Sequence, residues 1–100
     1  MEFNELKEKV LRDVPQADMG FLPDSPDTLN LGYLETGQTQ RLIFSVSQYR
    51  GKKFFDIRTW YQEDSGQWKP TKKGVHLSFE RFADFRETLA LFEPVIALDK

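Results

Sequence analysis

The chain has 100 residues, the size of one small domain, with a net charge of −2 and no cysteine. Without cysteine, neither a disulfide framework nor a thiolate metal site can form. Hydrophobic residues at 39% and aromatic residues at 14% exclude a disordered chain. The first ten residues, MEFNELKEKV, are charged and amphipathic rather than apolar. We therefore expect a cytoplasmic protein that makes no contact with a membrane.

The first predicted element is an amphipathic helix over residues 3–14. Its apolar residues recur at helical spacing on one side, and Pro15 lies just beyond its end. Residues 15–28 contain three prolines, one glycine and three aspartates, which predicts a loop. We therefore divide the chain into an N-terminal helix with an acidic loop, residues 1–28, and a second part, residues 29–100.

Alternating apolar and polar residues predict strands in the next part of the chain. Turn-forming residues separate these strands at Thr36-Gly37, at Tyr49–Lys52 and at Glu63–Gly66. The predicted strands run over residues 29–33, 39–48, 53–62 and 68–77. The last strand is irregular around Pro70 and Gly74.

The last predicted element is a helix that begins after Ser78, whose hydroxyl can accept a hydrogen bond from an unpaired backbone N–H. Apolar residues then step by three or four positions and form one continuous stripe, which Pro94 ends. The stripe comprises Phe79, Phe82, Phe85, Leu89 and Phe92. It offers more apolar surface than one small sheet needs, so we expect its members from Phe82 onward to form a homodimer interface.

Basic residues are concentrated in the middle of the chain. Residues 41–74 carry eight basic side chains against three acidic ones, a net of +5, whereas residues 1–40 carry a net of −5. The aromatic residues among these cations are Tyr49, Phe54, Phe55, Trp60, Tyr61 and Trp68. Cations follow a phosphate backbone and aromatic rings stack on unpaired bases. The segment therefore predicts a nucleic-acid interface on a chain that is acidic as a whole.

A series of short motifs in this segment resembles the single-stranded-DNA-binding domain of the positive cofactor four family of transcriptional coactivators. The motifs are, in order, Tyr49-Arg50-Gly51-Lys52, Asp56-Ile57-Arg58, the aromatic pair at 60 and 61, Asp64-Ser65-Gly66, Lys69-Pro70-Thr71-Lys72-Lys73-Gly74, and Leu77. The resemblance covers residues 40–92 and has no gap from 49 to 77. A family lysine that precedes the first matching strand corresponds here to Gln40, with Arg41 beside it.

This resemblance implies an α+β fold in which a curved antiparallel sheet of about four strands is followed by a C-terminal helix, with a short N-terminal helix added here. It also implies that two copies pair through their helices and that Tyr49, Arg58, Tyr61 and Lys73 face the nucleic acid. Together with the neighbouring cations and one further ring, the candidate binding residues are Arg41, Tyr49, Arg50, Lys52, Arg58, Tyr61, Trp68, Lys69, Lys72 and Lys73.

The aromatic candidates have a structural alternative, because rings in strands more often pack in a core than bind bases. We expect Phe54, Phe55 and Ile57 to be buried. Trp60 and Tyr61 are consecutive, so they should face opposite sides of a regular strand, and one of them is then free to stack. For Trp68, packing and stacking are equally open.

The basic candidates also have a structural alternative. The run from Lys69 to Gly74 would ordinarily be a solvated loop, and Arg58 can pair with Asp56 or Glu63 in an ion pair that contributes little stability. The family motif favours nucleic-acid contact for the lysines. The place of Arg58 in an aromatic-rich strand favours contact with a phosphate or a base.

We expect residues 29–100 to form a single-stranded nucleic-acid-binding domain, and the protein to be a homodimer that binds single-stranded DNA. The transcription machinery is an expected further partner, and we expect no cofactor and no catalytic residue. His76 is the only histidine and has no spaced cluster that would make a metal site. The sequence also contains no phosphate-cradling glycine loop and no nucleophile elbow. One alternative is an RNA-binding protein of the same fold. Another is a protein-interaction dimer in which the acidic arm covers the basic groove.

Overall fold

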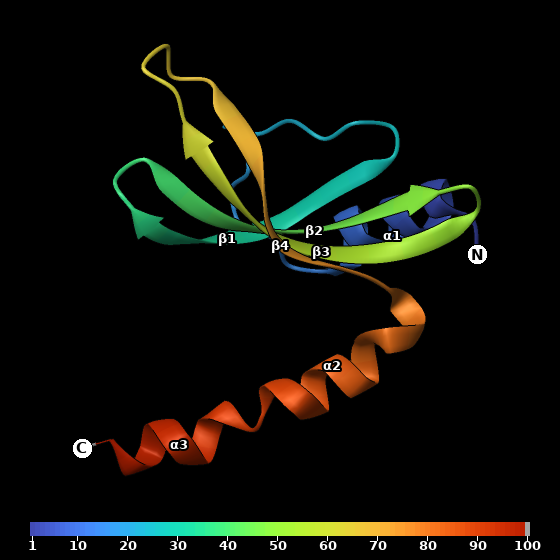
Figure 1. Ribbon diagram of the computed structural model, residues 1–100. Coiled ribbons are helices and arrows are strands. Elements are labelled where there is room, and N and C mark those ends of the chain that lie inside the picture. The colour runs from blue at the N-terminus through green and yellow to red at the C-terminus, as the bar shows by residue number, and fades with distance from the viewer. Residues whose placement is uncertain (100) are drawn as a thin grey trace.

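The computed structural model describes residues 1–99 and confirms the α+β class, with a four-stranded antiparallel sheet between N-terminal and C-terminal helices (Figure 1). The elements are α1 (Phe3–Asp13), β1 (Thr28–Gly37), β2 (Gln40–Tyr49), β3 (Lys52–Gln62), β4 (Trp68–Ser78), the 3-10 helix η1 (Phe79–Arg81), α2 (Phe82–Leu89) and α3 (Phe92–Leu98). The strands follow one another in the sheet in the order β1-β2-β3-β4. Within the described residues, no helix is both long and apolar enough to cross a membrane.

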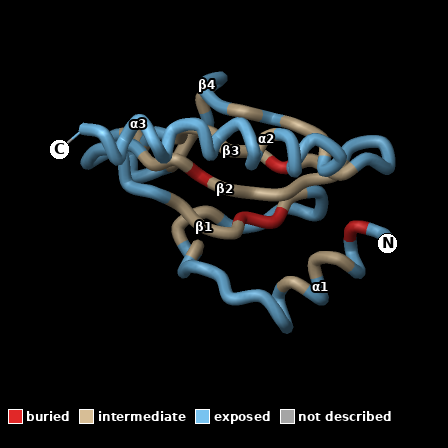
Figure 2. The backbone as a smooth tube through the Cα atoms, turned by 90° about the horizontal axis from the view of Figure 1, so that it is seen from below, coloured by how far each residue is buried: buried red, intermediate tan, exposed pale blue. Residues whose placement is uncertain are grey.

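The two faces of the sheet have different chemistry because side chains alternate along each strand. One face, which we call the helix face, is turned toward α2. On it, Phe44 and Val46 of β2 lie beside Phe55 and Ile57 of β3. The other face, which we call the groove face, carries polar side chains from the same strands, beginning with Ser45 opposite Asp56. Burial of residues in the core is confined to short stretches of α1, β1, β2 and β3 (Figure 2).

The pairing of β3 with β4 shifts between Arg58 and Trp60, so that residues 71–73 form a bulge. The hydroxyl of Thr71 stabilises it by donating to the carbonyl of Thr59 at 2.7 Å and accepting from the N–H of Lys73 at 3.1 Å. Gly74 follows directly and faces Arg58 across the ladder, where a Cβ atom would lie only 2.8 Å from the Arg58 Cα. Only glycine lets the two backbones approach this closely.

The N-terminal arm, residues 1–28, ends at the first residue of β1 and lies along the outer edge of that strand. In Figure 2, α1 is beyond β1, on the side away from β4. The N–H of Ala17 donates to the carbonyl of Leu31 at 3.2 Å, and the carboxylate of Asp24 accepts from the N–H of Asn30 at 2.8 Å. The fully buried ring of Phe3 anchors α1. The arm therefore provides hydrogen-bond partners for backbone groups of the edge strand β1 that would otherwise be open to solvent.

Two details of the predicted elements were wrong. The first turn lies at Gln38 and Thr39 rather than at Thr36-Gly37, because β1 continues to Gly37. The C-terminal helix is not continuous: η1 and α2 are followed by a break at residues 90–91 and then by α3. Pro94 does not prevent α3, because it is in the first turn, where a backbone N–H has no helical partner.

Ser78 does occupy the N-cap position of the C-terminal helical segment, as predicted, in an extended conformation. Its side chain, however, makes no capping hydrogen bond. The start of this segment therefore follows from the end of β4 and the packing of Phe82 and Phe85 on Phe55 rather than from a cap.

Candidate nucleic-acid interface

The groove face contains a polar hollow of about 230 Å³ that crosses the middle of the sheet. Strand β2 contributes Ser45 and Ser47, strand β3 contributes Asp56, Arg58 and Trp60, and strand β4 contributes His76. The register explains this gathering, because Ser45 is opposite Asp56 and Asp56 is opposite His76. We call this hollow the groove.

Arg58 is held firmly inside the groove. Its Nε and Nη2 atoms donate to the two carboxylate oxygens of Asp56 at 3.2 and 2.8 Å, and its Nη1 donates to the carbonyl of Thr71 at 3.3 Å. The hydrogen bond to Asp56 raises the pKa of Arg58 above its ordinary value, and partial burial opposes this effect. Arg58 is therefore a fixed cation with 32% of its side chain still open to solvent.

His76 and Phe54 extend the groove beyond Asp56. The Nδ1 atom of His76 lies 3.1 Å from a carboxylate oxygen of Asp56, and its ring stacks on Phe54 with centroids 4.7 Å apart. Only 14% of the Asp56 side chain is exposed, against 47% for His76. Sequence reasoning gave His76 no role in binding, because its neighbours along the chain reveal nothing of a carboxylate 20 residues away.

The hairpin between β2 and β3 presents an exposed ring beside two cations. Tyr49 is 63% exposed, and the guanidinium of Arg50 lies 5.1 Å from the centre of its ring. Arg50 adopts a left-handed backbone conformation with φ of 51°, and Gly51 follows with φ of 77°. Lys52 is also exposed. The tight turn thus brings Tyr49, Arg50 and Lys52 together at the end of the sheet.

Trp60 and Tyr61 do face opposite sides of the sheet, as predicted from their consecutive positions. Trp60 lines the groove with Arg58, whereas the regular pairing of β3 with β2 places Tyr61 on the side of the helix face. Tyr61 is 40% exposed and pairs with Gln40 and Lys69. Phe55 is buried, as expected, whereas Phe54 and Ile57 are only half-buried.

The three lysines of β4 lie at the open edge of the sheet. Lys72 and Lys73 belong to the bulge and are exposed, and Lys69 is half-buried beside Tyr61. The bulge turns this part of the strand out of the regular ladder. The basic run is therefore part of a strand and not a separate solvated loop.

Arg41 and Trp68 belong to a packed cluster rather than to an open surface. The guanidinium carbon of Arg41 lies 4.2, 4.5 and 4.6 Å from the ring centres of Phe21, Tyr33 and Trp68. Phe21 also contacts Tyr33 and Trp68 directly, with centroids 5.1 and 5.5 Å apart. We call this the Arg41 cage. Sequence reasoning missed Phe21 and Tyr33 as members of this cluster. The one available signal was Phe21 itself, a single aromatic residue in the proline-rich loop of residues 15–28.

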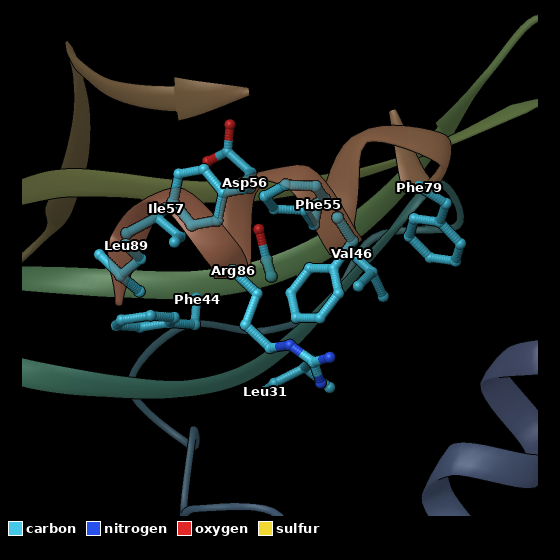
Figure 3. A pocket seen from close by; sticks show the side chains of 12 residues that line it. Leu31, Phe44, Val46, Phe55, Asp56, Ile57, Phe79, Arg86 and Leu89 are labelled. Atoms are coloured by element: carbon cyan, nitrogen blue, oxygen red, sulfur yellow. The ribbon is translucent and has the colours of Figure 1, made fainter. Parts of the chain in front are cut away.

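An apolar cleft of about 660 Å³ separates α2 from the helix face. Figure 3 shows Phe44, Val46 and Phe55 along this cleft, with Leu89 and Phe79 toward its two ends. Phe82 and Phe85 already pack against Phe55 of their own chain. Beyond them, α2 and α3 extend away from the sheet (Figure 1), and Leu89 and Phe92 are 51% and 61% exposed.

No group of three or more side chains suited to hold a metal ion occurs among residues 1–99. The groove instead combines hydrogen-bond donors with flanking rings, an arrangement that suits a ligand with both a flat face and a polar edge.

Comparison with known proteins agrees with this geometry. The sequence profile of a family described as Transcriptional Coactivator p15 (PC4) matches residues 36–88. The fold is similar to the crystal structure of BPSL1147, a PC4 homolog from Burkholderia pseudomallei K96243. The tetragonal form has a TM-score of 0.62 at 26% identity over 66% of this chain and 97% of that chain. The orthorhombic form has a TM-score of 0.61 at 24% identity over 71% and 96%.

The fold is also similar to the bacteriophage T5 homolog of the eukaryotic transcription coactivator PC4, which is implicated in recombination-dependent DNA replication. That structure has a TM-score of 0.53 at 20% identity, over 73% of this chain and 82% of that chain. The profile match begins at residue 36, so α1, Phe21 and most of β1 precede the part that the family shares.

Proposed function

Because the chain belongs to the PC4 family of transcriptional coactivators, we propose that it binds single-stranded DNA, without catalysis, in a coactivator-like role. The observation that supports this most is the groove, where the fixed cation Arg58 lies beside Trp60 and between the exposed hairpin ring of Tyr49 and the lysines of β4. Unpaired strands offer both phosphates and base faces, which is the combination that such a surface suits.

The proposed mechanism has two parts. Lys72 and Lys73, with Arg50 and Lys52 of the hairpin, attract the phosphate backbone, and their effect weakens as salt is added. Tyr49 then stacks on a base, and stacking contributes about 1–3 kcal/mol per base. Tyr61 would take part where the DNA strand passes around the end of β3 to the other side of the sheet. Arg41 and Trp68 would contribute mainly by supporting that end of the sheet.

We further propose that the protein acts as a homodimer through α2. Leu89 and Phe92 leave an apolar surface in water beside a cleft that one chain does not fill. Fully burying an apolar side chain of this size contributes about 1.5–3 kcal/mol. A second copy presents the same surface, so that pairing two of them covers both.

The position of the arm bears on the alternative of a protein-interaction dimer with a covered groove. That alternative requires residues 1–28 to lie across the basic strands. The arm instead lies along β1, at the opposite side of the sheet from β4 (Figure 2). It reaches the groove face at the Arg41 cage and at Asn30 of β1, whose side-chain amide donates to the carbonyl of Leu22 at 3.3 Å. Its position, along β1, therefore gives this alternative no support.

Titration of labelled single-stranded DNA, duplex DNA and RNA over a range of salt concentrations tests the proposal. We expect the tightest binding for single-stranded DNA, with a log-affinity that falls linearly with log salt by about 0.7 per phosphate contact. Equal binding of duplex, or no binding of any strand, would contradict the proposal. Tighter binding of RNA of the same sequence would favour the RNA alternative, and contacts to the 2′-hydroxyl would explain it.

A further inference from the structure

The groove is poorly suited to a phosphate group, although it contains an arginine. Arg58 is paired with Asp56 through two hydrogen bonds, so the two charges largely cancel for any ligand that approaches from outside. A phosphate bound to Arg58 would also lie close to the Asp56 carboxylate, and like charges repel at such distances. Among residues 1–99, no acidic side chain forms an ion pair with the exposed lysines of β4, Lys72 and Lys73, so they suit phosphates better.

The hydrogen bonds of Arg58 leave a defined set of free donors. A guanidinium has five N–H bonds, and three of them donate to Asp56 and Thr71, so two remain. Because Asp56 and Thr71 hold the plane of the guanidinium in place, these two donors are oriented before any ligand arrives. One free donor remains on each of the two terminal nitrogens, Nη1 and Nη2, and such a pair matches a ligand with two adjacent acceptors.

The surroundings of Arg58 favour a flat, neutral ligand. Trp60 lines the groove beside it, and the stacked rings of His76 and Phe54 lie on the other side of Asp56. Ser45 and Ser47 add hydroxyl groups to the floor. The groove is open to solvent, and its volume of about 230 Å³ is on the scale of a single nucleobase rather than a helix or strand of a protein.

We propose that the groove binds the base of a guanine in the single strand, with Arg58 donating to its O6 and N7 atoms. Guanine presents these two adjacent acceptors, and a bidentate arginine is their commonest specific partner. The site gives the protein a preference among unpaired sequences, whereas stacking and phosphate contacts alone would give little. This inference rests on the proposed function, because it assumes that a single strand lies on the groove face.

The test uses the full-length protein and short oligothymidine strands that carry one central guanine, one central 7-deazaguanine, or thymine alone. We expect the guanine strand to bind about tenfold more tightly than oligothymidine. The 7-deazaguanine strand should lose most of that gain, because it keeps the ring and the O6 atom but has no N7 acceptor. This comparison needs no protein variant, so a failure to fold cannot obscure it.

Two variants then separate the roles of the cations. Arg58→Lys keeps the charge but not the two donors on separate nitrogens of a planar guanidinium, so it should abolish the guanine preference and leave the salt dependence unchanged. Lys73→Ala should weaken binding of all three strands equally and reduce the salt slope by about 0.7. Circular dichroism checks that both variants remain folded.

Three results would overturn the guanine site: equal binding of the guanine strand and oligothymidine, full affinity for 7-deazaguanine, or a guanine preference that survives in Arg58→Lys. In each of these the oligothymidine still binds, so the proposed single-strand function stands. Loss of binding to every strand by the unaltered protein would instead overturn both.

Discussion

Tyr49 is the ring whose environment most favours a base as its partner. Its side chain is 63% exposed at a tight turn, with a guanidinium on one side and nothing that would bury it. Trp68 has a larger ring but is half-buried against Phe21 and Arg41. We therefore expect exposure and the arrangement of neighbours, rather than ring size, to decide which ring of this sheet stacks on a base.

Replacing Tyr49 with Ala should weaken single-strand binding by about 1–3 kcal/mol, because one stacked base loses its platform. The slope of log-affinity against log salt should not change, since no phosphate contact is lost. Fluorescence anisotropy at several salt concentrations measures both quantities. Tyr49→Phe is the matched control and should bind normally, and an affinity that is unaltered in Tyr49→Ala would remove this ring from the interface.

At the scale of elements, the bulge in β4 determines where Arg58 lies. Residues 71–73 bulge out of the ladder, and the carbonyl of Thr71 thereby becomes a partner for the Arg58 guanidinium. Gly74 then returns the strand to close contact with β3. The irregularity predicted around Pro70 and Gly74 is thus the feature that supports the groove.

Gly74→Ala should destabilise the protein by about 1–3 kcal/mol, because the added Cβ has no space and the strands must separate. Chemical denaturation measures this change in the free energy of unfolding. Gly32→Ala is a suitable control, since its Cβ would meet the Ala17 Cβ at an ordinary distance of 3.8 Å. Equal stability of the two variants would contradict the role assigned to Gly74.

The arm shows how an acidic segment can belong to a basic domain without covering it. Residues 1–28 carry a net charge of −4, yet they contact the groove face through uncharged groups, the ring of Phe21 in the Arg41 cage and the carbonyl of Leu22 at Asn30. A cation against an aromatic face contributes about 0.5–1 kcal/mol at an exposed site and more where water is excluded. The arm is thus joined to the sheet by packing as well as by backbone hydrogen bonds.

Phe21→Ala should lower the free energy of unfolding by about 1–2 kcal/mol, since a half-buried ring and its contact with Arg41 are both lost. Phe21→Leu should recover part of this stability by restoring apolar contact without the aromatic face. Urea denaturation of the two variants separates packing from the cation–π contribution. If Phe21→Ala unfolded at the same urea concentration as the unaltered chain, the cage would have no structural role.

At the scale of the whole molecule, the C-terminal helices expose apolar side chains that the single chain does not cover. A domain of this size buries a limited share of its surface, and here α2 and α3 extend from the sheet with apolar side chains exposed. Phe85 packs on Phe55 of the same chain, so its replacement would damage the monomer as well as an interface. Leu89 is the better residue for a test of assembly.

Leu89→Asp should convert a dimer at micromolar concentration into a folded monomer, because a charge would be placed in the apolar contact. Sedimentation velocity measures the mass, and circular dichroism confirms the fold. Leu11→Asp provides the control, since Leu11 is similarly exposed at 57% but belongs to α1, which lies beyond β1 and away from α2 (Figure 2). A monomeric unaltered protein under the same conditions would refute the proposed dimer.

The sequence by itself determined the features that depend on neighbours along the chain. Helical spacing predicted α1, alternation predicted the four strands, and turn residues such as Arg50 and Gly51 predicted the hairpin. Consecutive positions were enough to place Trp60 and Tyr61 on opposite sides. The family motif over the same stretch predicted the order of the elements as well.

Only the tertiary structure decided which of the candidate residues are exposed to solvent and which already contact other side chains of the chain. Asp56 meets Arg58 and His76, and Phe21 meets Arg41 and Trp68, through contacts that depend on strand register and on the path of a loop. These partners lie up to 47 residues apart, between Phe21 and Trp68, and no local pattern encodes such pairs. The break between α2 and α3 was also beyond prediction, because helix continuity depends on what the apolar stripe packs against.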